Sequence, residues 1–271
     1  MKIENLQDGA VQLLTETCQI LNSENINYII VGGWSPFLLN SSPINHPGTK
    51  DVDILFENGY KKDSLKEIIL KFIENDYLLS AKHDFQLFKE IQVSDKTFIY
   101  NIDLLHPSET NIPEEIYIDH IDLQIPSTIY QSDTFKMKSI ALPSSQTLFN
   151  NNLMIPYEIN GVSVKLMNEI GTLLTKSQSL KIKKRFRDSL DIYLAITQTN
   201  QNTNLVVELE KLKQNDLEIF NVLYGIREFF DEESNQMYYN VKKYIHDLEL
   251  NEFTSEINDF FKKIGLNELA R

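Results

Sequence analysis

The spacing of apolar residues changes along the chain, and this change limits the folds that it can adopt. Up to about residue 105, segments with helical spacing alternate with short β-branched or alternating segments that indicate strands. The expected helices cover residues 3–22, 34–40 and 61–74. The expected strands cover residues 27–31, 51–56, 85–93 and 98–105. This alternation predicts one sheet with helices packed against it, in an α/β or α+β domain.

The second half of the chain has a different pattern. After Val164 the regular segments have helical spacing, which predicts a helical bundle. The expected helices cover residues 166–176, 185–197, 204–212, 217–230, 236–248 and 253–264, with a polar loop at 198–204. Residues 106–160, rich in Pro, Ser and Asn, are compatible with a hairpin and connecting loops. We therefore expect an α/β-type domain over residues 1–160 and a helical domain over residues 161–271.

Composition excludes several classes of protein. Cys18 is the only cysteine, so the chain can form no internal disulfide, cysteine zinc site or iron–sulfur cluster, and we expect it in a helix core. No run of 18 apolar residues is present and no secretory signal is visible, which predicts a cytoplasmic protein with no membrane partner. The 39 Asp and Glu outnumber the 26 Lys and Arg, giving a net charge of −13. This acidity argues against a broad nucleic-acid footprint but permits a local basic patch.

Two adjacent glycines mark a candidate phosphate site. The chain has only 9 Gly, yet Gly32 and Gly33 stand together directly after the strand at 27–31. A glycine pair at a strand end lets the backbone turn sharply and lets a phosphate approach backbone N–H groups. A helix that begins at Trp34 or Ser35 would add its positive end. A plain tight turn is the alternative interpretation.

Paired carboxylates follow in the next expected strand. Asp51 and Asp53 are two residues apart, which places both on one face of a strand, about 6.5–7 Å from each other. Two acids on one face repel each other unless they are solvated or bind cations. A third acid, Asp103, lies in the very hydrophobic strand at 98–105. If the two strands are neighbours, the three carboxylates converge; an exposed strand face with incidental acids is the alternative.

Three converging carboxylates predict a metal site. Their oxygens are hard ligands that suit Mg²⁺ or Mn²⁺, and Mg²⁺ also binds substrate phosphates. The chemistry implied is phosphoryl or nucleotidyl transfer from an NTP, with one or two metals. Lys50, next to Asp51, is a further candidate for a phosphate contact, with a solvated lysine as the alternative.

A second group of charged residues lies in the helical half. Asp188 and Asp191 are three residues apart and share a helix face, while Lys176 lies on the preceding expected helix. An ion pair that holds the bundle together is one interpretation, and a phosphate-binding site is the other. From residue 176 to 187 the segment has six basic residues and no acid. This local reversal of charge suits a polyanion such as an NTP or an RNA, although a solvated loop fits equally well.

Taken together, these motifs resemble the nucleotidyltransferase superfamily related to DNA polymerase beta. The resemblance rests on the order strand, Gly32-Gly33 and helix, then Asp51-Val52-Asp53, then Asp103 on a later strand. Leu173-Leu-Thr-Lys176 and Arg185-Phe-Arg-Asp188-Ser-Leu-Asp191 are similar to the Lys helix and the RDxxDI helix of the AbiEii/AbiGii toxin family. The matched motifs span about residues 28–196.

The resemblance implies a fold, a function and roles for residues. The implied fold is a mixed sheet flanked by helices, followed by a helical bundle. The implied function is Mg²⁺-dependent nucleotide transfer by the toxin of a bacterial toxin–antitoxin or abortive-infection system, with a cognate antitoxin; mycobacterial relatives act on the 3′ end of tRNA. Carried over by position, the triphosphate would contact Gly32, Gly33, Ser35 and Lys176. The metal would be bound by Asp51 and Asp53, with Asp103 as the superfamily's third carboxylate and Asp188 or Asp191 completing the site.

Two other functions remain open. The Gly-Gly-Trp and Asp-Val-Asp motifs also resemble aminoglycoside nucleotidyltransferases, whose polycationic substrates would be attracted by an acidic protein. The basic segment 181–187 argues against that acceptor and favours tRNA or another RNA. The other function is that of a non-catalytic binding protein on the same fold, because a fold does not establish an activity.

Overall fold

The computed structural model describes residues 3–24, 26–57, 62–80, 82–108, 118–122, 134–137, 139–182 and 185–266. Its internal contacts divide the chain into two compact units. The sheet unit comprises Met1–Val31, Thr49–Phe149 and Ile155–Leu166, and the helical unit comprises Gly32–Gly48, Asn150–Met154 and Met167–Arg271. The chain therefore enters the helical unit directly after the first strand and leaves it again just before Asp51.

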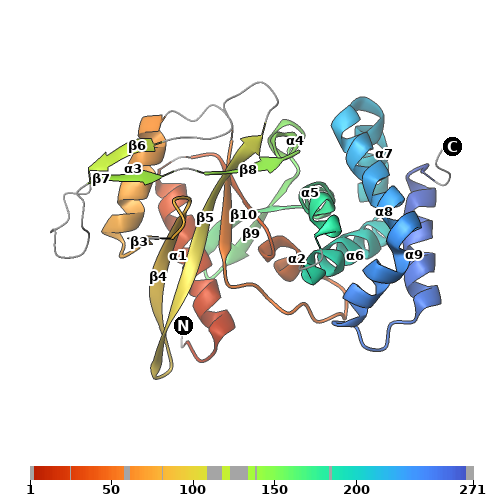
Figure 1. The fold of residues 1–271 in the computed structure, drawn as a ribbon, viewed down its shortest axis with the longest axis horizontal. Coiled ribbons are helices and arrows are strands. Elements are labelled where there is room, and N and C mark those ends of the chain that lie inside the picture. The colour runs from red at the N-terminus through yellow and green to blue at the C-terminus, as the bar shows by residue number, and fades with distance from the viewer. Residues whose placement is uncertain are drawn as a thin grey trace. The chain divides into compact units, whose positions relative to one another are not determined.

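A mixed sheet forms the centre of the sheet unit. Its strands lie in the order β3 (Leu78–Leu79), β4 (Gln86–Val93), β5 (Lys96–Ser108), β2 (Val52–Phe56), β1 (Tyr28–Val31), β10 (Val162–Met167) and β9 (Met154–Ile159), with β8 (Ile140–Pro143) paired to β5. β2 is antiparallel to β1 and parallel to β5, while β5 is antiparallel to β4. Figure 1 shows β4 and β5 as one long hairpin. A mixed sheet with flanking helices and a helical second half confirms the predicted α+β class.

Helix α1 (Leu6–Ser23) packs against the sheet because one of its faces is apolar. Leu13, Leu14 and Cys18 on that face are fully buried, as predicted for Cys18, and burial raises the pKa of its thiol to about 12. The helix begins at a capping box in which Asn5 and Asp8 bind each other's backbone N–H groups. A Cβ at Gly9 would clash with the hydroxyl group of the buried Tyr100, so glycine permits this close approach of α1 to β5.

The helical unit is built around a buried aromatic cluster. Its helices are α2 (Trp34–Leu38), α5 (Glu169–Lys176), α6 (Phe186–Gln201), α7 (Thr203–Asn215), α8 (Leu217–Lys242) and α9 (Leu250–Lys263), with a 3₁₀ turn at Ser177–Lys181. The ring of Phe253 contacts those of Tyr193, Phe230 and Tyr238 at centroid distances of 5.3–6.1 Å. No helix among the described residues is long and apolar enough to cross a membrane.

Several predicted element boundaries are wrong, each for a local reason. Residues 217–230 and 236–248 belong largely to one helix, α8, which is broken only at Glu233, where φ and ψ are −128° and 31°. The predicted loop at 198–204 is helical except for Asn202, whose side chain caps α7. The helix predicted from residue 166 begins at Glu169 instead, because Leu166 belongs to β10 and Asn168 provides the N-cap.

Residues 106–160, where the sequence was compatible with a hairpin and connecting loops, form several short elements. Within residues 106–160 the structure has β8, β9, helix α4 (Gln146–Asn150), and the antiparallel pair of β6 (Ile118–Asp122) and β7 (Thr134–Met137). The pair agrees with the predicted hairpin; the residues that join its strands lie outside the described part of the chain. Helix α3 (Lys62–Glu74), predicted at 61–74, completes the unit, and β6 lies against it.

Candidate active site

The glycine pair makes the turn that the sequence predicted. β1 ends at Val31, and α2 begins at Trp34. Gly32 has φ of +73°, a conformation that residues with a Cβ rarely adopt, whereas Gly33 has φ of −83° and serves as the N-cap of α2. The side chain of Ser35 is fully buried in the helical unit. The backbone turn therefore requires glycine at position 32, and the roles of Gly32, Gly33 and Ser35 in phosphate binding stay predictions.

The register of the sheet brings two of the predicted acids together. β2 and β5 are direct parallel neighbours, and Asp53 lies opposite Asp103. On the other side of β5, Gln86 of β4 lies opposite Asp103, and its Nε2 donates a hydrogen bond of 2.7 Å to Asp103 Oδ1. Asp51 is exposed just before β2 begins. The two strands are thus neighbours, which is the condition that the sequence analysis set for the acids to converge, and Gln86 is a partner that it missed.

The electrostatics of Asp103 differ from those of an ordinary surface acid. Burial raises the pKa of its carboxyl group, the hydrogen bond from Gln86 lowers it, and the negative charge of Asp51 raises it again. His83 makes a smaller contribution that lowers the pKa. The net direction is upward, so the ionised form of Asp103 is disfavoured in the folded protein. A cation bound between the acids would reverse this effect.

The acids Asp51, Asp53 and Asp103 suit a metal ion whose remaining ligands are waters and substrate phosphates. In the described part of the chain, no three His, Cys, Asp or Glu side chains are arranged as a ready metal site. Mg²⁺, however, characteristically takes one or two protein carboxylates and completes its octahedron with waters and substrate phosphates. Asp53 and Asp103, which lie opposite each other in neighbouring strands, offer the two carboxylates that such a site needs. Metal binding by Asp51, Asp53 and Asp103 stays a prediction.

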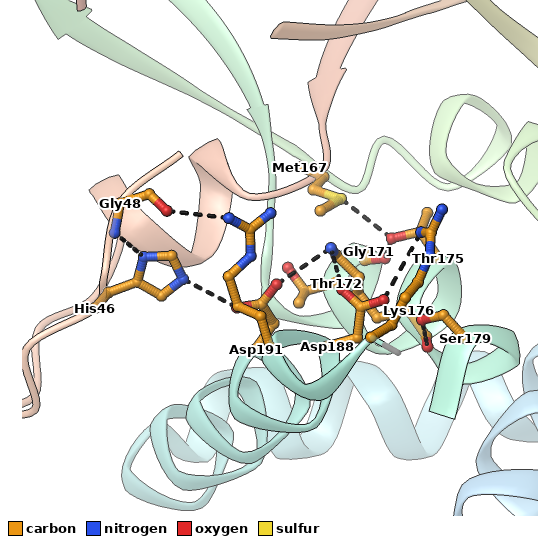
Figure 2. Close-up of polar contacts among 12 residues, drawn as sticks. His46, Gly48, Met167, Gly171, Thr172, Thr175, Lys176, Ser179, Asp188 and Asp191 are labelled. Atoms are coloured by element: carbon orange, nitrogen blue, oxygen red, sulfur yellow. Dashed lines mark hydrogen bonds and ion pairs between the residues drawn. The ribbon is translucent and has the colours of Figure 1, made fainter. Parts of the chain in front are cut away.

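The predicted charged residues of the helical unit form one buried cluster (Figure 2). Lys176 Nζ lies 2.7 Å from Asp188 Oδ1 and 3.2 Å from Asp191 Oδ2, and all three residues are buried. For Asp188, burial raises the pKa, but Lys176, Ser179 and Arg185 together outweigh it, and the net direction is downward. For Lys176, burial lowers the pKa but Asp191 and Asp188 outweigh it, so the net direction is upward. The structure thus contains the ion pair between α5 and α6, and a role in phosphate binding stays a prediction.

His46 extends this cluster, although no motif in the sequence indicates it. His46 Nε2 lies 2.9 Å from Asp191 Oδ1, and the backbone N–H of Gly48 donates to His46 Nδ1 at 3.1 Å. Because a backbone N–H only donates, Nδ1 must be the unprotonated nitrogen, and Nε2–H donates to Asp191. The carbonyl of Gly48 accepts a 3.1 Å hydrogen bond from Arg187. Two hydrogen bonds, His46 to Asp191 and Arg187 to Gly48, therefore hold the loop that ends at Gly48 against α6 (Figure 2).

The predicted basic patch is only partly exposed. Lys181 and Arg185 are exposed, whereas Arg187 is half-buried and bonded to Gly48; Lys183 and Lys184 lie outside the described residues. The ammonium group of Lys243 lies over the ring of Phe186, which adds a cation beside the patch. Lys50 is exposed. Binding of a polyanion by these residues stays a prediction.

Comparisons with known proteins give little further information. No protein-family model matches the chain, and no curated protein matches it. Among solved structures, the chain is similar to an antigenic nucleotidyltransferase-like protein from Paracoccidioides brasiliensis, with a TM-score of 0.38 and 19% sequence identity. The match covers 80% of this chain and 93% of that one. Similarity at this level supports no inference about activity or site residues.

Proposed function

We propose that this chain is a metal-dependent nucleotidyltransferase that moves a nucleotide from an NTP to an acceptor, with an RNA such as tRNA as that acceptor. The observation that carries the proposal is the register of β2 and β5, which sets Asp53 opposite Asp103 in neighbouring strands. Burial and the charge of Asp51 raise the pKa of Asp103, as expected where a cation belongs to the functional state.

Each acidic residue has a distinct part in the proposed site. Asp53 and Asp103 bind Mg²⁺ or Mn²⁺, Asp51 adds a third carboxylate, and Gln86 positions Asp103 through its hydrogen bond. When bound, the metal would neutralise charge on the transferring phosphate and lower the pKa of the attacking hydroxyl. The backbone at Gly32 and Gly33, with Ser35 and Lys50, is the proposed contact for the triphosphate.

The acceptor and the biological role rest on different features. Lys181 and Arg185 are exposed cations in a protein of net charge −13, and cations gathered at one place suit the phosphates of an RNA. The resemblance of Lys176, Asp188 and Asp191 to the AbiEii motifs suggests a cytoplasmic growth-inhibiting toxin with a cognate antitoxin. By the same resemblance Lys176, Asp188 and Asp191 are site residues.

A transfer assay tests the proposal. The protein is incubated with each of four α-labelled NTPs and Mg²⁺, with total tRNA as acceptor, and in parallel with an aminoglycoside panel. Asp53→Asn and Asp103→Asn should each lower transfer by at least about 100-fold, because a metal contributes several kcal/mol to stabilising the transition state. The matched control is Asp95→Asn, an exposed carboxylate in the turn between β4 and β5, which should leave transfer unchanged. Removal of the metal with EDTA should abolish transfer, and added Mg²⁺ should restore it.

Other outcomes would replace the proposal. Label in an aminoglycoside but not in tRNA would assign a small-molecule acceptor. Transfer that survives both Asp53→Asn and Asp103→Asn would show that these carboxylates are not the catalytic centre. Absence of label from every acceptor, with NTP binding unchanged by either substitution, would favour a non-catalytic binding protein.

A further inference from the structure

The helical unit contains a polar cavity that none of the predicted site residues lines. The cavity has a volume of about 510 Å³, within the range of small-molecule sites. It lies where the loop after α2, the start of α5, the end of α6 and the start of α7 come together. Its hydroxyl and amide groups come from Ser41, Gln198, Gln201, Asn202, Thr203 and Asn204.

Glu169 is the one charged residue among the described residues that line this cavity. One of its carboxylate oxygens, Oε2, is shut away from solvent and has no hydrogen-bond partner among the described residues. On its inner side, the gap toward Ser35 has a volume of only about 10 Å³, too small for more than a single water. The Glu169 side chain lines both spaces, and of the two only the cavity is large enough for a ligand.

Glu169 is half-buried, and the groups that shift its pKa include no cation. Burial raises the pKa of its carboxyl group, its own backbone N–H lowers it, and Glu208 on α7 raises it further. The net direction is upward, so ionised Glu169 makes the fold less stable at neutral pH. The described cavity wall offers hydrogen-bonding groups but no Lys, Arg or His to balance the carboxylate.

We propose that this cavity is a binding site for a small molecule that carries a primary ammonium group, which pairs with Glu169 while the amide and hydroxyl wall binds its other polar groups. An ammonium ion supplies three donors and a positive charge, which are what the carboxylate lacks. The wall itself is preformed: Gln198 Oε1 accepts from Ser41 N at 3.2 Å, and Asn202 Oδ1 caps α7. The proposal does not depend on the nucleotidyltransferase activity.

Two pairs of probes test the ammonium group. Binding of glucosamine and of spermidine to the full chain is followed by NMR shifts of the backbone amides at Thr203–Leu205. N-acetylglucosamine and N¹,N⁸-diacetylspermidine, which lack the primary ammonium groups, are the controls. We expect the amines to shift these signals at millimolar concentrations and their acetylated forms to bind at least 10-fold more weakly. Binding of glucosamine alone would indicate an amino sugar, and binding of spermidine alone an aliphatic polyamine; either result supports the site.

Two variants test the carboxylate. Glu169→Gln should weaken binding at least 10-fold, whereas Glu210→Gln, which removes a charge from α7 outside the cavity wall, should not. Since Glu169→Gln removes a half-buried charge that the fold disfavours, the melting temperature of the variant should not fall, so loss of binding cannot be attributed to unfolding. Equal binding of an amine and its acetylated form, unchanged affinity in Glu169→Gln, or no shift at Thr203–Leu205 with any amine would each overturn the proposal. Asp53→Asn should leave amine binding intact whatever its effect on nucleotide transfer.

Discussion

The sheet unit and the helical unit each contain a group of carboxylates, and the two groups are compensated in opposite ways. In the helical unit, Lys176 lies between Asp188 and Asp191, and the pKa of Asp188 is lowered despite its burial. In the sheet unit, Asp103 lies opposite Asp53 in the neighbouring strand, its hydrogen bond comes from the neutral amide of Gln86, and its pKa is raised. One group is balanced by the protein's own cation, whereas Asp103 keeps an unfavourable charge.

This difference separates residues that stabilise the fold from residues that make it less stable. A carboxylate with a lowered pKa adds stability at neutral pH, and one with a raised pKa subtracts it. We therefore expect the cluster of Lys176, Asp188 and Asp191 to stabilise the fold, independently of any role in a functional site. Asp103 is retained at a cost to stability, which is the pattern expected of a functional acid. The predictions that follow test the sign and size of this difference.

Lys176→Met should cause the largest loss of stability. The substitution keeps an aliphatic side chain of similar length but leaves Asp188 and Asp191 buried without their cation. Removal of one partner from a buried ion pair costs about 3–5 kcal/mol. Urea-induced unfolding at pH 7, followed by circular dichroism, measures the change. The stabilisation from Asp188 should also be lost as the pH falls below its unfolded value of about 4, and that from Lys176 as the pH rises above about 10.4, because their pKa values move in opposite directions.

Lys71→Met is the matched control for that experiment. Lys71 forms an ion pair with Glu74 at 3.4 Å on the surface of α3, where both side chains are about half exposed. Exposed pairs contribute no more than about 1 kcal/mol, so this variant should unfold almost like the wild type. If Lys176→Met were no more destabilising than Lys71→Met, the buried cluster would not be a stabilising element, and the contrast between the two units would disappear.

His46→Ala should have an intermediate effect. The substitution leaves Asp191 Oδ1 and the N–H of Gly48 without the imidazole that now bonds both, and unsatisfied buried groups cost about 1–3 kcal/mol. His246, an exposed histidine, provides the control variant His246→Ala, which should change the free energy of unfolding little. His46→Gln, which retains a donor and an acceptor, should recover part of the loss. Equal stability of His46→Ala and the wild type would mean that the imidazole does not fasten the loop.

The partners of the candidate site differ in how far the sequence could predict them. The strands of Asp53 and Asp103 were predictable because period-two alternation and β-branched content mark them clearly. Gln86 was predictable in principle: a two-residue turn at Ser94–Asp95 pairs Val93 with Lys96, and counting seven residues outward from that pair places Gln86 opposite Asp103. Only the exact turn length was missing from the sequence analysis.

His46 and Glu169 had no comparable signal. His46 lies in an irregular loop whose path is fixed by contacts with Asp191, 145 residues later in the chain, and no local spacing encodes such a contact. Glu169 stands at the start of α5, where acids are common because they favour the helix dipole, so its unusual environment is set by packing alone. The start of α5 was likewise hard to predict, because Leu166 fits the helical spacing but belongs to strand β10 and pairs with β1 in the sheet.

Asp103→Asn should give the smallest change in stability, and in the opposite direction. The neutral amide keeps an oxygen that accepts the hydrogen bond from Gln86 but removes the charge disfavoured by burial and by Asp51. Because the folded pKa of Asp103 is raised, the wild type loses stability as the pH rises from the unfolded value of about 4 through the raised value. The variant lacks this loss, so its melting temperature relative to wild type should increase over that interval and stay constant above it. Asp95→Asn, at an exposed position, should show no such trend. A melting temperature of Asp103→Asn below that of the wild type at pH 7 would place Asp103 with the structural acids and remove the strongest physical argument for a cation beside it.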